Sequence, residues 1–377
     1  MFDFNILGPI ALLLLAGVAI VFAYRKAYES TPLSPVHKGK AHDHSHDKDG
    51  DRFSCKFDAE EVRRTANQKR PRIEPGNAAA DPKVAAILAA VQQSRIETAI
   101  KQLSGELPIT VGGKQVKLVT RNSYHGNIEL AIQHLEAFYA SVGLKTERHM
   151  YKVRGKTYYN LIAEKTGKVT PKNVLYVGGH LDSTAGWPWS NEELAPGADD
   201  DASGTVGVME CAIALSKMDT DHTVRFCHFT GEEQGLYGSY AYSDVVSKKT
   251  DEKVIGMIQM DMIGYCKLPG NRVDLHDNVD QNGSHSLVVI LTQNAARYGL
   301  NLNVVDTHNR AVENRSDHAG FLDHGFRAIM VSEEFTEEGF TPFYHTKNDR
   351  IVNMNLPFMT DVIRMVLAGV IELSGAK

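Results

Sequence analysis

One apolar run that ends in polar residues decides the fold: VLYVGGHLDS, residues 174–183. Its first six residues are apolar or glycine, which is typical of a strand buried on both faces of a sheet. Similar runs follow at 223–229, 254–260 and 328–331, and patterns with helical spacing separate them. Buried strands that alternate with helices predict a three-layer α/β domain.

The other predicted elements come from the same periodicities. We expect further strands at 158–163 and 302–305. We expect helices at 84–103, 127–142, 202–215, 238–247, 286–298 and 356–373. Because ligands of such sheets gather at the carboxyl ends of the strands, polar residues that follow a strand are the first candidates for a functional site.

The composition excludes several classes of protein. The chain has 377 residues, of which 42% are hydrophobic and 23% charged, and this argues against wholesale disorder, collagen-like repeats and a polytopic membrane protein. Its net charge of −5 provides no basic field, so nucleic acid is not an expected partner. Four cysteines without a Cys-x-x-Cys pair are too few for a disulfide scaffold, although a single disulfide stays open.

The N-terminal part of the chain differs from the remainder. Residues 4–24 carry no charge and would form a helix of about 31 Å, which predicts a single transmembrane anchor. A cleaved signal peptide and a buried soluble helix are the alternatives. Residues 25–82 form a predicted flexible linker whose histidines either bind metal weakly or are only solvated. Residues 83–377 are the predicted α/β domain. Basic residues follow the anchor, and they favour a cytoplasmic location for the part of the chain after it.

Residues that can bind metal follow the predicted strands. His180 ends the first strand, and Asp182 is placed to orient its second ring nitrogen. The segment GADDDASG, residues 197–204, brings three adjacent acids to the start of a helix, where one could act as a cap. Glu232 and Glu233 follow the next strand, where one could act as a general base and the other could bind metal.

Two more candidates complete the set. Asp261 follows the strand at 254–260, and His345 lies in the aromatic sequence PFYHT. These residues come from different junctions of strand and loop and could converge on one edge of the sheet. Two histidines together with three carboxylates suit a pair of borderline metal ions, for which zinc is the best candidate.

Five motifs in this order resemble the bacterial leucyl aminopeptidase family, metallopeptidase family twenty-eight: GGHLDS, PGADDDASG, GEEQGLYGS, Asp261-Met262 and YHT. The resemblance covers the chain from about Arg95 to its C-terminus. It implies a mixed, mostly parallel sheet of about eight strands between helices. It also implies two zinc ions per chain and an aminopeptidase that hydrolyses the N-terminal residue of peptides with a free N-terminus.

The resemblance implies a role for each motif residue. Five of them would bind zinc, with Asp200 shared between the ions: His180 and Asp261 for one ion, Glu233 and His345 for the other. Glu232 would be the general base that takes a proton from the attacking water, and Asp182 would orient His180.

The same resemblance places a substrate pocket beside the motif Arg315-Ser-Asp-His318. The residues expected around this pocket are Met262, Glu313, Arg315, His318, Phe343 and Tyr344. The stretch 311–315 lacks the tyrosine and the disulfide that some members have there. Glu313 would favour a basic or polar first residue unless it is a solvent-facing loop acid. The resemblance also favours a periplasmic catalytic domain, against the flanking charges.

Three other functions stay open. A glutaminyl-cyclase-like acyltransferase shares the fold and most ligands but works with one zinc, and typically lacks the acidic run that is intact here. A glutamate-carboxypeptidase-like enzyme would need an arginine patch, and the motifs have no dense arginine cluster beside them. A non-catalytic, receptor-like homologue would have lost ligands or the base, which this chain retains.

Overall fold

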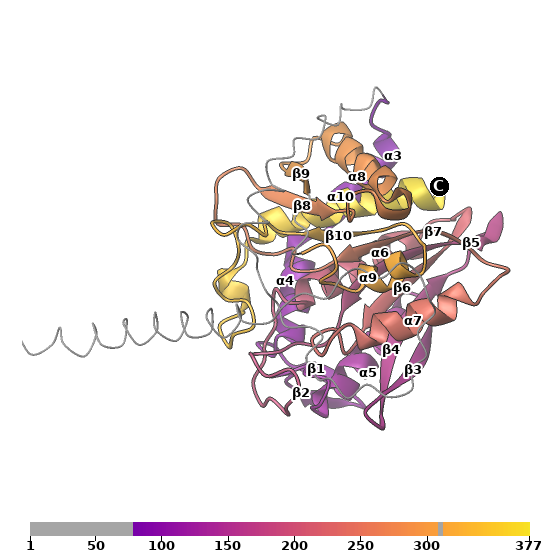
Figure 1. Ribbon diagram of the computed structural model, residues 1–377. Helices are drawn as coiled ribbons and strands as arrows, with labels where there is room; N and C mark the ends of the chain where they lie inside the picture. Colours follow the sequence, from indigo (N-terminus) through magenta and orange to yellow (C-terminus); the bar gives the residue numbers. More distant parts are fainter. Residues whose placement is uncertain (1–77, 308–311) are drawn as a thin grey trace, which may run out of the picture. The chain divides into compact units, whose positions relative to one another are not determined.

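One eight-stranded mixed sheet carries the rest of the fold (Figure 1). The computed structural model describes residues 78–307 and 312–377, all of which fall within one unit, Arg63–Lys377. The strand order is β3-β4-β6-β5-β7-β10-β8-β9, and the four central strands β6, β5, β7 and β10 run parallel to one another. The expected three-layer α/β fold with a mixed eight-stranded sheet is confirmed.

The strands of this sheet are β3 (Lys145–Val153), β4 (Lys156–Lys165), β5 (Thr170–His180), β6 (His222–Phe229), β7 (Lys253–Met260), β8 (Arg272–His276), β9 (Asn303–Thr307) and β10 (Ala328–Ser332). A separate hairpin consists of β1 (Ile109–Val111) and β2 (Lys114–Val116). The described α-helices are α3 (Pro82–Ala89), α4 (Gln93–Leu103), α5 (Asn127–Ser141), α6 (Ala202–Ser216), α7 (Tyr237–Ser247), α8 (His285–Arg297), α9 (His318–Asp323) and α10 (Leu356–Ser374).

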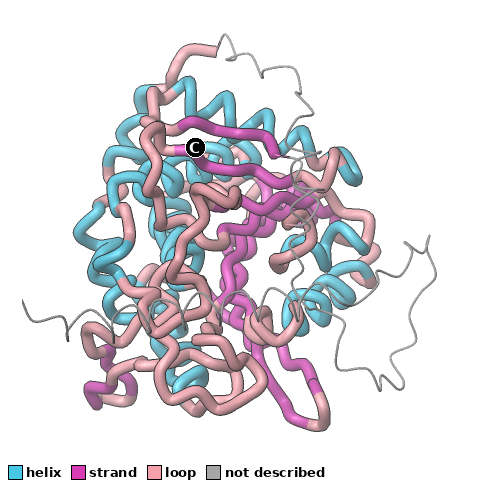
Figure 2. The backbone as a smooth tube through the Cα atoms, turned by 60° about the vertical axis from the view of Figure 1, so that its left-hand side comes forward, coloured by secondary structure: helices cyan, strands magenta, loops and turns pink. Residues whose placement is uncertain are grey.

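Helices cover both faces of the sheet (Figure 2). Along β5, Leu175 and Val177 face a large apolar core shared with α4, α5, α6, α8 and α10. The alternate residues Val174 and Tyr176 face a smaller core under α7 and α9. This alternation is the two-residue period of a strand that is buried on both faces.

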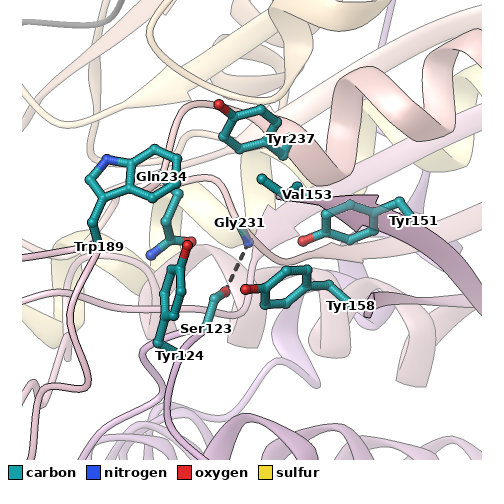
Figure 3. Close-up of a pocket in the computed structure, with 9 residues that line it drawn as sticks. All are labelled: Ser123, Tyr124, Tyr151, Val153, Tyr158, Trp189, Gly231, Gln234 and Tyr237. Carbon is teal, nitrogen blue, oxygen red and sulfur yellow. Dashed lines mark hydrogen bonds between the residues drawn. The ribbon is translucent and has the colours of Figure 1, made fainter. Parts of the chain in front are cut away.

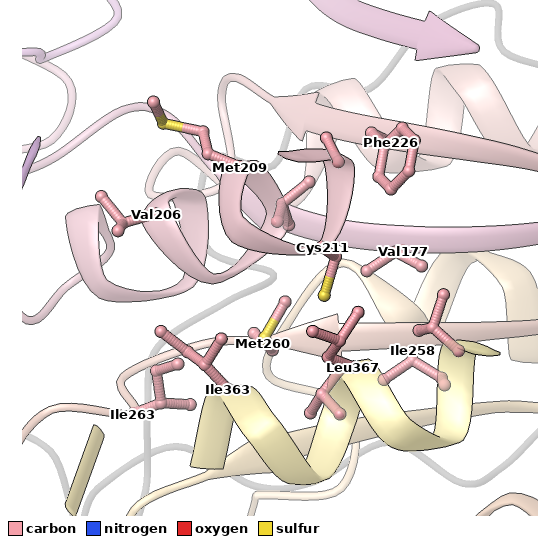
Figure 4. Close-up of a cluster of buried hydrophobic side chains, with 14 of the residues drawn as sticks. Val177, Val206, Met209, Cys211, Phe226, Ile258, Met260, Ile263, Ile363 and Leu367 are labelled. Carbon is pink, nitrogen blue, oxygen red and sulfur yellow. The ribbon is translucent and has the colours of Figure 1, made fainter. Parts of the chain in front are cut away.

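Helix α6 lies in the middle of the larger core. Figure 4 shows its residue Cys211 close to Val177 of β5 and to the side chain of Leu367 from α10, with Val206 nearer the start of the helix. Most of its residues are buried, which explains why its sequence is apolar on every side. Burial of this helix fixes where its N-terminus meets the sheet.

Two glycines allow α6 to approach the sheet closely. A Cβ on Gly179 would lie 2.7 Å from the carbonyl carbon of Gly204, and a Cβ on Gly204 would lie 2.1 Å from the backbone oxygen of Met260. Both distances are shorter than any relaxed contact, and the neighbouring atoms belong to the backbone. The start of α6 is therefore pressed against the ends of β5 and β7.

Several elements differ from the sequence-based expectations. The helix expected at 84–103 is divided into α3 and α4, because Gln92 is extended. Strand β3 was not expected, since it lies at the edge of the sheet and its polar side chains interrupt any apolar run. Strand β8 was missed as well, because its five residues include an ion pair between Arg272 and Asp274.

The expected localisation at a membrane is corrected by the structure. Within residues 78–307 and 312–377 no helix is at once long and apolar enough to cross a bilayer. The segment 4–24, to which the anchor was assigned, and most of the linker 25–82 lie outside the described residues. Of the cysteines, Cys211, Cys227 and Cys266 are free, and Cys55 also lies outside that part of the chain.

The close approach of α6 makes a prediction for Gly179→Ala. The added methyl group must displace backbone atoms, so we expect the free energy of unfolding in urea to fall by about 1–3 kcal/mol. The matched control is Gly126→Ala, where nothing lies within 4 Å of the added Cβ, and we expect a change within about 0.5 kcal/mol. Equal stabilities of the two variants would contradict the close contact.

Candidate metal centre

Three neighbouring parallel strands bring the metal-binding candidates to one edge of the sheet. β5 ends at His180, the loop after β6 carries Glu232 and Glu233, and Asp261 follows β7 directly. Because these strands run parallel, their carboxyl ends lie side by side. Asp200 reaches the same edge from the N-terminus of α6.

Two groups of possible ligands share one carboxylate. His180, Asp200 and Asp261 form the first group, and Asp200, Glu233 and His345 form the second, each with donor atoms within 4.8 Å of one another. The Nε2 atom of His180 lies 3.1 Å from Oδ1 of Asp200, whereas Nε2 of His345 lies 3.2 Å from Oδ2 of the same residue. Asp200 thus turns one oxygen toward each histidine.

The spacing of these donor atoms is close to that of zinc ligands. Tetrahedral ligands at roughly 2.0–2.2 Å from an ion lie roughly 3.3–3.6 Å from one another. The Nε2 atom of His180 lies 3.6 Å from Oδ1 of Asp261, within this range, whereas Nε2 of His345 lies 2.9 Å from Oε2 of Glu233, a hydrogen-bond distance shorter than the range. Both groups combine imidazole nitrogen with carboxylate oxygen, a donor set that suits zinc.

The ring of His180 is oriented by its neighbours. Its Nδ1 atom lies 3.1 Å from the backbone oxygen of Asp182 and 3.7 Å from the Oδ1 atom of that residue. The hydrogen bond to the carbonyl therefore holds the proton on Nδ1 and leaves Nε2 as a free ligand atom. The carboxylate of Asp182 also accepts hydrogen bonds from the Ser123 hydroxyl and the Glu232 backbone N–H.

The three adjacent acids have different surroundings. Asp201 caps α6 by accepting from the Gly204 N–H at 2.7 Å, and it also accepts from the backbone N–H of His180. Asp199 accepts from the N–H of Gly264. The middle residue, Asp200, faces the two histidines. The loop conformation therefore separates the capping acid from the metal-binding candidate.

The electrostatics also point to a cation. Burial, reinforced by nearby acids, raises the pKa of Glu232 well above its usual value and that of Glu233 to about 7. Burial alone would also raise the pKa of Asp200, but its contacts with His180 and His345 lower it. The buried Oε1 atom of Glu233 receives no hydrogen bond from the described residues. Bound dications would satisfy this oxygen and offset the crowded charges.

Arg121 supports the site, and no sequence motif marked it. Its guanidinium is fully buried and donates hydrogen bonds of 2.7–2.8 Å to the backbone oxygens of Leu103, Leu181, Pro196 and Gly197. Leu103 is the last residue of α4, whereas the other three lie near the two ends of segment 181–201, which joins β5 to α6. Arg121 therefore holds together the two ends of this segment, one next to His180 and the other next to Asp200.

The residues expected around a substrate pocket lie beside this centre in different environments. Met262 is buried and shares a small apolar cluster with Val312 and Phe335, against which Tyr344 packs. The Tyr344 ring also stacks on His345, with centroids 3.6 Å apart. Phe343 is half-buried and contacts Tyr265 edge to face.

The other three pocket candidates lie on the segment before α9. Glu313 is only 1% exposed, so the alternative that it is a solvent-facing acid is wrong. His318 is buried with Nε2 2.7 Å from the backbone oxygen of Glu313, and burial lowers its pKa to about 4. Arg315 is half-buried. Next to it, the hydroxyl of Ser316 donates to Asp261 and so steadies a metal-binding candidate.

Comparison with known proteins gives the family. The sequence model of peptidase family M28 matches residues 160–370. Leucine aminopeptidase 1 of Arthroderma gypseum is 31% identical over 229 residues, which are 57% of this chain and 58% of that protein. The chain thus spans little more than half the length of this relative.

Solved structures share the fold. A zinc aminopeptidase of Bacillus subtilis matches with a TM-score of 0.50 and 27% identity, over 59% of this chain and 51% of that one. A glutaminyl cyclase of Fimbriiglobus ruber matches with a TM-score of 0.61 and 19% identity, over 80% of this chain and 99% of that one. The second likeness concerns the fold alone. With the family match over more than half of its length, the chain belongs to peptidase family M28.

Proposed function

We propose that this chain is an aminopeptidase that binds two zinc ions and removes the N-terminal residue from peptides with a free N-terminus. The observation that carries the proposal is the position of Asp200, whose two carboxylate oxygens face His180 and His345 separately. One zinc would be held by His180 and Asp261, the other by Glu233 and His345, and Asp200 would bridge them. Residues 83–377 would form the catalytic domain.

The charges of the carboxylates at this site support two zinc ions rather than one. Asp200, Glu232, Glu233 and Asp261 together carry four negative charges when ionised, which equals the charge of two dications. A single dication would leave two buried carboxylates uncompensated, and such charges are costly in a low-dielectric site.

Glu232 would act as the general base. Zinc, when bound, supplies Lewis acidity and lowers the pKa of the attacking water. The Oε2 atom of Glu232 lies 4.0 Å from Nε2 of His180, and its backbone N–H is tied to the Asp182 carboxylate. From this position Glu232 can take the proton of the water during attack and pass it to the leaving amine.

The names of the relatives support a peptidase that uses zinc, since they include a leucine aminopeptidase and a zinc aminopeptidase. A glutaminyl cyclase is the second candidate function, and the likeness of fold favours it as much as it favours an aminopeptidase. It is ranked lower because the donor set for a second zinc is complete here.

Met262, Glu313, Arg315, His318, Phe343 and Tyr344 are proposed to surround the first residue of the substrate.

Replacement of the base gives the first test of this function. Glu232→Gln removes the proton acceptor but none of the proposed ligands, so kcat for leucine p-nitroanilide should fall roughly 10²–10⁴-fold while the zinc content stays unchanged. The matched control is Glu193→Gln, an exposed loop acid whose change should leave kcat as it is. A Glu232→Gln enzyme with the wild-type rate would exclude the proposed base.

Metal content gives the second test. We expect two zinc ions per chain by elemental analysis after gel filtration, about one in Asp261→Asn, and at most one weakly held ion in Asp200→Ala. Removal of zinc with a chelator should abolish hydrolysis, and added zinc should restore it. One tightly bound zinc in the wild-type protein, together with cyclisation of N-terminal glutamine, would favour the cyclase instead.

A further inference from the structure

The segment 120–123, between β2 and α5, lies against segment 181–201 at the metal centre. The backbone N–H of Arg121 donates to the Ser183 hydroxyl at 3.1 Å, and the Arg121 guanidinium binds carbonyl groups near both ends of segment 181–201. Ser123 follows two residues later and is only 6% exposed. The contacts of Arg121 therefore fix the place of a buried serine beside the metal centre.

The hydroxyl of Ser123 joins two groups of the site. It accepts a hydrogen bond from the Gly231 N–H at 3.0 Å, drawn in Figure 3, and it lies 3.1 Å from Oδ2 of Asp182. Because the Gly231 N–H can only donate, the single hydrogen of the hydroxyl is left for the Asp182 carboxylate. The other oxygen of this carboxylate, Oδ1, accepts from the Glu232 N–H at 3.3 Å.

These three hydrogen bonds close a ring around the α-carbon of Gly231. The N–H groups of Gly231 and Glu232 follow each other in the chain, and they are bound by Ser123 and Asp182, which are bound to each other. A change in the φ or ψ angle of Gly231 would turn one N–H group relative to the other and break a bond of the ring. The ring therefore fixes the backbone immediately before Glu232.

This restraint acts where the backbone would otherwise be most free. Gly231 has a φ of 71°, and a Cβ at this position would lie 2.6 Å from the hydroxyl oxygen of Tyr151. The left-handed conformation and the close approach both require glycine, which has more conformational freedom than any other residue. Without the ring, the residue before Glu232 could adopt several conformations, and the direction of the Glu232 side chain would vary with them.

Aromatic side chains surround the hydroxyl of Ser123. Figure 3 shows it among Tyr124, Tyr151 and Tyr158. Tyr151 and Tyr158 are stacked with centroids 5.6 Å apart, and Tyr124 contacts Tyr158 edge to face at 6.1 Å. Hydrogen bonds are stronger in surroundings of low polarity than in water. The packed rings thus strengthen the restraint that Ser123 and Asp182 place on the loop.

We propose that Ser123 is a positioning residue for the general base Glu232. This inference rests on the proposed aminopeptidase function. A general base must lie within hydrogen-bond reach of the proton that it takes, and a displacement of about 1 Å can lower the rate by about 10²-fold. The backbone oxygen of Asp182, which accepts from His180, does not depend on the serine hydroxyl. Loss of this hydroxyl should therefore affect the base and leave the zinc ions bound.

Ser123→Ala in the full-length protein tests this role in two backgrounds. In the wild-type background we expect kcat for leucine p-nitroanilide to fall roughly 10–100-fold, with KM changed less than about threefold and the zinc content unchanged. In the Glu232→Gln background the same substitution should lower the residual kcat by less than about threefold, because the base through which Ser123 acts is already absent. Equal losses of kcat in both backgrounds, or a loss of zinc, would overturn the proposal.

Two further variants separate positioning from a loss of stability. Ser374→Ala removes a buried hydroxyl at the end of α10 and should leave kcat at the wild-type value. Ser123→Thr keeps the hydroxyl that closes the ring and should retain most of the wild-type kcat. A loss of kcat in Ser123→Thr as large as that in Ser123→Ala would count against the hydroxyl as the group responsible.

Hydrogen exchange of the backbone gives a measurement that needs no substrate. Peptides that cover residues 230–236 should exchange faster in Ser123→Ala than in the wild-type protein, and Ser374→Ala should not change their rate. Unchanged exchange in this loop would reject the ring as its restraint. Faster exchange, in a protein whose wild type hydrolyses no aminoacyl substrate, would support the restraint and reject the aminopeptidase function. Hydrolysis by the wild type with an unchanged kcat in Ser123→Ala would reject the positioning role alone.

Discussion

The burial of several carboxylates around Asp200 is the constraint on which the rest of the structure depends. A buried charge without compensation costs several kcal/mol, so each acid at this edge of the sheet needs a partner. Some acids find it in backbone N–H groups, as Asp201 does at the start of α6 and Asp349 does with the N–H groups of Asp199 and Asp200. Asp200, Glu233 and Asp261 instead lie close to His180 and His345. A pair of bound cations would balance the charge of these carboxylates.

The surrounding fold supplies the geometry that this constraint demands. Gly179 and Gly204 let α6 touch the strand ends, so that the capping carboxylate of Asp201 also receives the backbone N–H of His180. The buried guanidinium of Arg121 joins the two ends of segment 181–201, next to His180 and Asp200, through their carbonyl groups. These contacts fix the backbone on both sides of Asp200, and the direction of its carboxylate follows from them.

Sequence reasoning located the features that are local in the chain. A strand that runs into a polar residue is visible in a few letters, which is why His180, Glu233 and Asp261 could be assigned to one edge of the sheet. It could not show that the backbone oxygen of Asp182 lies closer to the ring of His180 than its carboxylate does. Arg121 was missed because its partners lie far away in the sequence, and only tertiary packing brings them together.

The fold itself does not choose between the candidate reactions, because peptidases and a glutaminyl cyclase share it. The choice depends on side chains at the strand ends, where Asp200, Glu233 and His345 form a second group of possible metal ligands beside His180, Asp200 and Asp261. The number of zinc ions that these two groups hold is therefore the property that separates a two-metal peptidase from a cyclase that works with one zinc.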